Sequence, residues 1–166
     1  GLAKIHYLEG QFDDARRELE LVTRGNRAYL EAHDWLARTL DRLGDLEGAQ
    51  AVLGRALTTS PHAPLRQGQL GEIAYRRGEL DMAADAFRRQ VELARHTPLK
   101  SAEPYLWLSR ANLARGNRDD ALRALSELSI DMREDATARL LARAMEIPVR
   151  LRAGEPIMAG DRKVVR

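Results

Sequence analysis

The sequence predicts an all-α fold of stacked antiparallel helix pairs, and three regularities indicate it. Gly10, Gly44, Gly78 and Gly116 follow one another at a nearly constant spacing, which lengthens slightly only before the last of them. An alanine stands five positions after each of these glycines, and a large apolar residue stands nine positions after it. A fixed period of this size indicates one supersecondary unit repeated along the chain, because each unit can bury its apolar face only against a neighbour.

Apolar residues three and four positions apart predict a helix on either side of each glycine. After Gly10, for example, Phe12, Ala15, Leu19 and Val22 share one helical face. The expected helices span residues 1–8, 12–24, 28–43, 46–57, 63–77, 80–95, 102–115, 118–128 and 134–146.

Particular residues predict where helices end. Gly25 and Asn26 both tolerate the left-handed conformation that stops a helix, so we expect the second helix to end there. Pro61 should end the fourth helix, because proline disfavours helical conformation in the residue before it. The period lengthens by four residues around residues 96–101, which should form a longer, exposed loop. Pro148 should kink or interrupt the last helix, since it lacks a backbone N–H.

The spacing places one solenoid domain over residues 1–166, with four to five repeats of which the terminal ones are incomplete. The repeats span about 1–27, 28–63, 64–101, 102–131 and 132–166. The fifth is expected because Gly154 follows Gly116 at the same interval at which Gly116 follows Gly78, and Ala159 stands five positions further on. An irregular capping helix is the alternative. Residues 1–7 read as the middle of a helix, so we expect the sequence to be a piece of a longer protein.

Composition argues against several classes of function. The chain has 27 Lys and Arg against 25 Asp and Glu, and charges of both signs alternate along the expected helices. That alternation is typical of solvated helix faces, so we expect no nucleic-acid partner. The absence of cysteine excludes disulfide and thiolate chemistry and is compatible with a cytoplasmic protein. No apolar run approaches the roughly 20 residues that span a bilayer, so we expect no membrane insertion.

The residue types of catalytic and metal sites are present without the patterns that those sites need. The four histidines never pair at the helical step that puts two ligands on one face; they are His6, His33, His62 and His96. Two acidic pairs, Asp13–Asp14 and Asp119–Asp120, follow turn glycines, where carboxylates favour a helix N-terminus. No phosphate loop or nucleophile motif is present. We expect no catalytic residue, no metal and no cofactor, and a protein that is not an enzyme.

The best copy of the repeat carries, in order, Leu36, Ala37, Leu40, Gly44, Ala49, Leu53, Ala56 and Pro61. These residues resemble the 34-residue tetratricopeptide repeat, whose arrays form a right-handed solenoid of antiparallel helix pairs. At the fourth position, often tryptophan in that family, this sequence has His33, Gln67 and Tyr105.

The resemblance implies that the first helix of each pair lines a concave groove for a protein or peptide. The implied groove residues are Asp34, Arg38, Asp41, Arg42, Glu72, Tyr75, Arg76 and Arg110. A groove of mixed charge suits a peptide with both charge signs, and arginine supplies bidentate contacts to carboxylates. The clamp with which co-chaperones of this family capture acidic chaperone tails needs Lys and Asn where Asp34 and Arg38 stand, so we expect no such capture.

Trp35 and Trp107 occupy the sixth position of the second and fourth repeats. Each either packs between neighbouring helices or serves as an aromatic anchor in the groove, because tryptophan is enriched in binding hot spots.

A narrower resemblance concerns the partner. The amino-acid sequence of residues 29–37, 49–53 and 60–62 is similar to that of bacterial response regulators that attach a tetratricopeptide array to a receiver domain. It implies an interaction scaffold in cytoplasmic two-component signalling. The alternatives are a self-associating array that forms homo-oligomers, a subunit of a secretion machinery, and a nucleic-acid binder that uses surface arginines.

Overall fold

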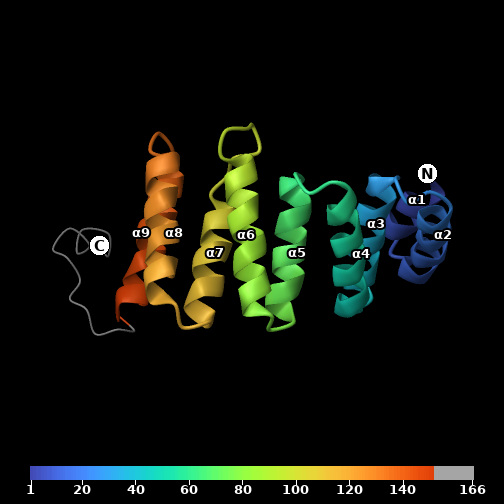
Figure 1. The fold of residues 1–166 in the computed structure, drawn as a ribbon, viewed down its shortest axis with the longest axis horizontal. Coiled ribbons are helices and arrows are strands. Elements are labelled where there is room, and N and C mark those ends of the chain that lie inside the picture. Colours follow the sequence, from blue (N-terminus) through green and yellow to red (C-terminus); the bar gives the residue numbers. More distant parts are fainter. Residues whose placement is uncertain (152–166) are drawn as a thin grey trace. The chain divides into compact units, whose positions relative to one another are not determined.

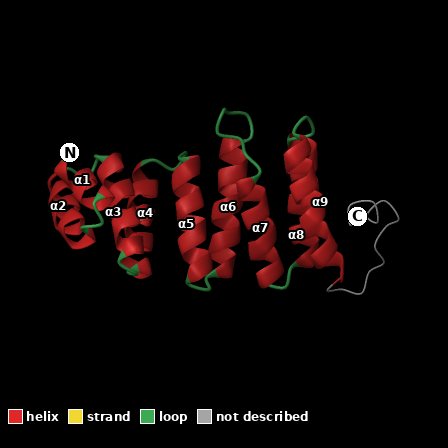
Figure 2. Ribbon diagram, turned by 180° about the vertical axis from the view of Figure 1, so that it is seen from behind, coloured by secondary structure: helices red, strands yellow, loops and turns green. Residues whose placement is uncertain are grey.

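The computed structural model describes residues 1–151, which contain nine α-helices and no strand (Figures 1 and 2). The helices are α1 (Leu2–Leu8), α2 (Phe12–Gly25), α3 (Leu30–Arg42), α4 (Leu46–Thr59), α5 (Pro64–Arg76), α6 (Leu80–Ala94), α7 (Glu103–Ala114), α8 (Arg118–Asp131) and α9 (Ala136–Leu151). The predicted all-α class of stacked helix pairs is confirmed. The chain divides into two compact units, residues 1–79 with α1–α5 and the residues from 80 onward with α6–α9.

The four repeated glycines end helices in the same way. They are the glycines with positive φ among the described residues, between 77° and 82°. At Gly44 the backbone N–H donates to the carbonyl of Asp41 at 3.0 Å, and the N–H of Asp45 donates to the carbonyl of Leu40 at 2.9 Å. This pair of bonds is the Schellman motif, which needs a left-handed residue at the helix end. The same pair recurs at the other three glycines.

The other two repeated positions form the core. The alanines five residues after each glycine are fully buried; they are Ala15, Ala49, Ala83 and Ala121. The large residues nine after each glycine are buried too, namely Leu19, Leu53, Phe87 and Leu125. The period in the sequence is therefore a period of core positions, because each small side chain lets two helices approach where each large one fills the space between them.

The second helix ends at Gly25, as expected. It does so without a left-handed residue, because Gly25 is not among the glycines with positive φ and Asn26 is extended at φ −139°. Pro148 does not interrupt α9, which continues to Leu151. Proline costs a helix interior about 3 kcal/mol, but on α9 Ala142 and Val149 are buried, and full burial of a valine offsets about 1.5–3 kcal/mol. The proposed fifth-repeat markers Gly154 and Ala159 lie outside the described residues.

The loop between α6 and α7 is exposed over residues 96–101, as predicted. Its Lys100 donates from Nζ to the carbonyl of Asp131, 3.0 Å away at the end of α8. Next to the loop, a partly buried polar cluster joins Arg95, just after α6, to α7 and α8. The hydroxyl of Tyr105 donates to Oδ2 of Asp131 at 2.6 Å. Arg95 places Nε 2.8 Å from the same oxygen and Nη2 3.3 Å from Oε2 of Glu127.

We expect Gly44→Ala to destabilise the protein, because alanine at positive φ is strained by about 1–2 kcal/mol. Gly54→Ala is the matched control: Gly54 lies inside α4, and a Cβ there meets no atom within 4 Å. This second change should stabilise the helix by about 0.5–1 kcal/mol. Urea unfolding followed by circular dichroism measures both. If Gly44→Ala and Gly54→Ala shifted the unfolding midpoint in the same direction, the left-handed turn assigned at Gly44 would be contradicted.

Tyr105 should make stability depend on alkaline pH. Burial, and then its hydrogen bond to Asp131, raise the pKa of Tyr105 from 10.0 to about 12. Because the folded protein holds the phenol neutral, its contribution is fully present below pH 10 and is lost as pH rises through 12. We expect Tyr105→Phe to lower the free energy of unfolding by about 1 kcal/mol at pH 8, and the difference from wild type to shrink above pH 10. A difference that stays constant to pH 12 would contradict this.

Candidate functional site

The first unit presents a surface of paired charges where α3 faces α5, and Asp34 and Arg66 anchor it. Nε and Nη2 of Arg66 donate to the two carboxylate oxygens of Asp34 at 2.7 and 2.9 Å. The Arg66 side chain is 8% exposed and that of Asp34 is 30% exposed. A bidentate pair of this kind is strong and holds both groups in one orientation.

Two further pairs continue along the same helices. With its oxygen turned toward Arg38, the Gln69 carboxamide accepts hydrogen bonds from Nε at 2.9 Å and from Nη2 at 3.3 Å. Arg76 on α5 forms an ion pair with Asp41 on α3. Asp34, Arg38, Asp41, Arg66, Gln69 and Arg76, together with Trp35, are called the α3–α5 surface below.

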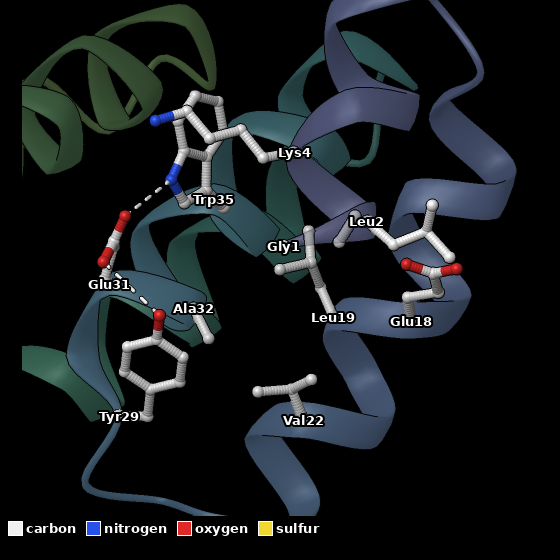
Figure 3. A pocket seen from close by; sticks show the side chains of 11 residues that line it. Gly1, Leu2, Lys4, Glu18, Leu19, Val22, Tyr29, Glu31, Ala32 and Trp35 are labelled. Carbon is white, nitrogen blue, oxygen red and sulfur yellow. Dashed lines mark hydrogen bonds between the residues drawn. The ribbon is translucent and has the colours of Figure 1, made fainter.

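Trp35 on α3 is half-buried, and Figure 3 shows it between Lys4 and Glu31. Its ring meets Tyr7 of α1 edge to face, with centroids 5.2 Å apart. Two cations lie over the indole, the Lys4 ammonium at 5.0 Å and the Arg38 guanidinium at 5.2 Å from its centroid. Its Nε1 donates to Glu31 at 3.4 Å. The indole is therefore fixed from several sides, and part of it remains accessible.

Beside Trp35 lies a pocket of about 280 Å³ between α1, α2 and α3. Figure 3 shows its apolar wall, formed by Leu2, Leu19 and Val22 with Ala32. Tyr29 stands at the rim, where its hydroxyl donates to Glu31 at 3.4 Å. Lys4, Glu18 and Glu31 add charged groups to the lining, so the pocket combines an apolar wall with charges of both signs.

In the second unit, Trp107 has a different environment from Trp35. Its ring stacks on Phe87 with an interplanar angle of 8° and centroids 5.6 Å apart. The guanidinium of Arg110 lies 5.3 Å from the indole centroid. Trp107 is partly buried like Trp35, and its stacking on Phe87 fits the interpretation that it packs between neighbouring helices.

The structure brings together part of the predicted groove set. Asp34, Arg38, Asp41 and Arg76 lie on the α3–α5 surface, and Glu72 and Tyr75 are on α5. Arg42 instead places its guanidinium 5.0 Å from the ring of Phe12. Arg110 belongs to the other unit.

Arg66, Gln69 and Lys4 were not among the predicted residues. A signal for Arg66 existed in the sequence, because this arginine follows Asp34 at close to the repeat period, where charges of opposite sign on successive first helices can meet.

Metal-holding clusters and membrane-spanning helices are both absent from the described residues. No group of three or more His, Asp or Glu side chains within residues 1–151 is placed to hold a metal ion. No helix in the same stretch combines the length and the apolar character needed to cross a membrane. Ion pairs and aromatic contacts dominate the α3–α5 surface.

We expect Asp34→Asn to lower the free energy of unfolding by about 2 kcal/mol, because it leaves the buried Arg66 guanidinium without its carboxylate. Arg16→Gln is the control, since Arg16 is 41% exposed and pairs only within its own helix. It should change stability by less than about 0.5 kcal/mol. Urea unfolding curves measure both variants. If Asp34→Asn and Arg16→Gln unfolded at the same urea concentration, the Asp34–Arg66 pair would not be needed for stability.

The fold has close structural relatives of low sequence identity. A protein solved under the name MamA superposes with a TM-score of 0.79 at 19% identity, over 93% of this chain and 85% of that chain. TTC0263, a tetratricopeptide repeat protein of Thermus thermophilus, gives a TM-score of 0.63 at 21% identity, with coverages of 86% and 77%. YrrB, described as a tetratricopeptide repeat protein with an unusual peptide-binding site, gives 0.68 at 20% identity, with coverages of 86% and 71%.

No curated protein sequence matches the chain. The family model named tetratricopeptide repeat matches it four times, over residues 1–20, 30–55, 64–89 and 102–127. These four segments make up more than half of the chain, and each contains one of the four turn glycines. The chain therefore belongs to the tetratricopeptide repeat family.

Proposed function

We propose that this protein is a non-catalytic scaffold that binds a segment of a partner protein on the α3–α5 surface, with Trp35 as the anchor. Membership of the tetratricopeptide repeat family supports a role in protein–protein interaction. The accessible part of the Trp35 indole, fixed beside charges of both signs, is the observation that carries the choice of surface.

The ion pairs of this surface bear directly on affinity. Arg38 and Arg76 are held by partners on the facing helix, so their rotamers are largely set before a ligand arrives. Ordering a long side chain at an interface costs about 0.5–1.5 kcal/mol, and pre-organisation removes much of that cost. Each charge also keeps an outer edge toward solvent: Arg76 is 50% exposed and Asp41 is 32% exposed. A peptide with both charge signs can therefore add hydrogen bonds without breaking the existing pairs.

Trp35 adds apolar contact area, which the charged pairs lack. A half-buried indole offers apolar area at the edge of a polar surface, the arrangement found in binding hot spots. Lys4 and Arg38 over its ring keep it from turning away. Trp107 is less suited to this role because Phe87 covers one face of its ring.

We further propose that the partner belongs to a bacterial signalling assembly, and that the complex forms in the cytoplasm. The support is the amino-acid sequence of residues 29–37, which resembles the array part of response regulators. This segment includes Trp35. On this proposal, the α3–α5 surface passes the state of an attached receiver domain to a partner.

Self-association is the second candidate, and one observation favours it. The second unit exposes three large apolar side chains on α8 and α9: Ile130 at 67%, Leu140 at 59% and Leu141 at 43%. Exposed apolar side chains of this size are a common feature of interaction surfaces, including those between copies of one chain.

Trp35→Ala combined with Arg38→Glu should abolish partner capture. The experiment immobilises wild type, this double variant and an Arg123→Glu control, and identifies proteins retained from a lysate of the source organism by mass spectrometry. Arg123 is 64% exposed and pairs only with Asp120 on its own helix, so the control changes charge in the other unit. We expect the same partner with wild type and control, and at least a tenfold loss with the double variant.

Two results would contradict the proposal. The first is equal capture by the double variant with an unchanged circular dichroism spectrum. The second is a dimer in light scattering that Leu140→Asp dissociates together with the captured partner, which would assign recognition to the apolar residues of the second unit.

A further inference from the structure

A second pocket in the first unit is lined by basic and hydroxyl side chains without a carboxylate. It lies where the ends of α2 and α4 meet the start of α3 and has a volume of about 510 Å³. Its lining consists of Thr23, Arg24, Arg27, His33, Arg55, Thr58 and Thr59. We call it the arginine pocket.

Most of the positive charge in the arginine pocket is unmatched. Arg24 pairs with Glu20 of its own helix, Nη2 to Oε2 at 3.5 Å. Arg27 and Arg55 have no ion pair or hydrogen bond from their side chains within residues 1–151. The His33 ring is buried and uses Nδ1 on the carbonyl of Tyr29 at 3.0 Å, while its other nitrogen has no partner in the same stretch. Three arginines around one hollow repel one another unless an anion lies between them.

The repeat supplies an internal comparison for this pocket. Gly44 and Gly116 are two repeats apart, and the same offset relates three residue pairs: His33 to Tyr105, Arg55 to Glu127, and Thr59 to Asp131. Gly10 and Gly78 are also two repeats apart, and their offset relates Arg27 to Arg95. Four of the residues that line the arginine pocket therefore have equivalents in the polar cluster of the second unit.

In the second unit the equivalent arginine is neutralised from within the chain. Arg95 lies 2.8 Å from an oxygen of Asp131 and 3.3 Å from an oxygen of Glu127. Tyr105 donates to Asp131 at 2.6 Å, and Arg88 pairs with Glu127 at 2.6 Å. In the first unit both carboxylates are replaced, one by arginine and one by threonine. Arg27 thus keeps the position of Arg95 and lacks both of its anions.

The helix dipole accounts for only part of this charge. A cation in the last turn of a helix is stabilised by about 0.3–1 kcal/mol, which explains Arg24 in the last turn of α2. The last turn of α4 contains no basic residue, so Arg55 is not placed by that effect. Arg27 lies beyond the end of α2, as Arg95 lies beyond the end of α6.

We propose that the arginine pocket binds an acidic segment of a partner protein, whose two carboxylates take the places that Glu127 and Asp131 fill in the second unit. Arg27 and Arg55 each present a planar guanidinium that can bind a carboxylate through two hydrogen bonds. The hydroxyl of Thr59 is a further donor, and the free ring nitrogen of His33 can donate when the imidazole is protonated. Glu127 and Asp131 are four residues apart on one helix, which sets the spacing expected in the ligand.

This site is separate from the α3–α5 surface and does not depend on the proposed function. Its residues lie at the ends of α2 and α4 and at the start of α3, and it shares no residue with that surface. Trp35→Ala should therefore leave binding at the arginine pocket unchanged, so the two proposals can fail independently.

The test is a titration of the 15N-labelled chain with a helical peptide that carries two glutamates four residues apart, followed by NMR. A peptide with glutamines in their place and inorganic phosphate are titrated in parallel. We expect saturable shifts of amides in residues 23–29 and 55–60 with the glutamate peptide. The Arg55→Glu/Thr59→Asp variant, which restores the second unit's pattern, should weaken binding at least tenfold. Arg17→Glu, on an exposed side chain outside the pocket, should weaken it less than twofold.

The melting temperature of Arg55→Glu/Thr59→Asp without peptide should equal or exceed that of wild type, because internal carboxylates then match Arg27. Absence of saturable shifts would overturn the proposal, as would equal weakening by Arg17→Glu or equal binding of the glutamine peptide. Phosphate that binds the same amides as tightly as the glutamate peptide would overturn the assignment to a carboxylate pair.

Discussion

The close packing of four alanines is the constraint on which the rest of this structure depends. Ala15, Ala49, Ala83 and Ala121 have no exposed surface, and each follows a left-handed glycine by five residues. Interiors are packed as densely as organic crystals, so a longer side chain at these crossings would push the helices apart. The glycine turns the chain and the alanine allows the next helix to return close to the previous one, which is why the two residues recur together.

Once the shared framework is set, positions outside the repeat pattern decide what each unit can bind. The second unit uses Tyr105, Glu127 and Asp131 to neutralise Arg95 inside the fold. The first unit places His33, Arg55 and Thr59 at the equivalent positions and leaves Arg27 unneutralised. The same helix-pair framework thus carries an internally neutralised polar cluster in one unit and a basic pocket in the other. The two units differ in charge at two equivalent positions: Arg55 corresponds to Glu127, and Thr59 corresponds to Asp131. The helix framework is the same in both.

On the α3–α5 surface, interhelical contacts hold the side chains that we propose for recognition. Burial of a charged pair such as Arg66 and Asp34 adds little net stability, because desolvation offsets the attraction. Its effect is on geometry: the bidentate contact sets how α5 lies against α3 and so where Arg38 and Arg76 stand. Several side chains that the family resemblance assigned to a groove therefore hold α3 and α5 together.

The sequence by itself determined the helices, the four glycine turns and the alanine and leucine core positions, because these depend on spacing within one or two turns and on a period that repeats along the chain. It also placed the exposed loop at residues 96–101. Only the tertiary structure decided that Arg66 binds Asp34, that Trp35 and Trp107 have different neighbours, and that α9 continues through Pro148. Each of these depends on distances between helices or on burial against a neighbouring helix. Local periodicity carries no information about such contacts.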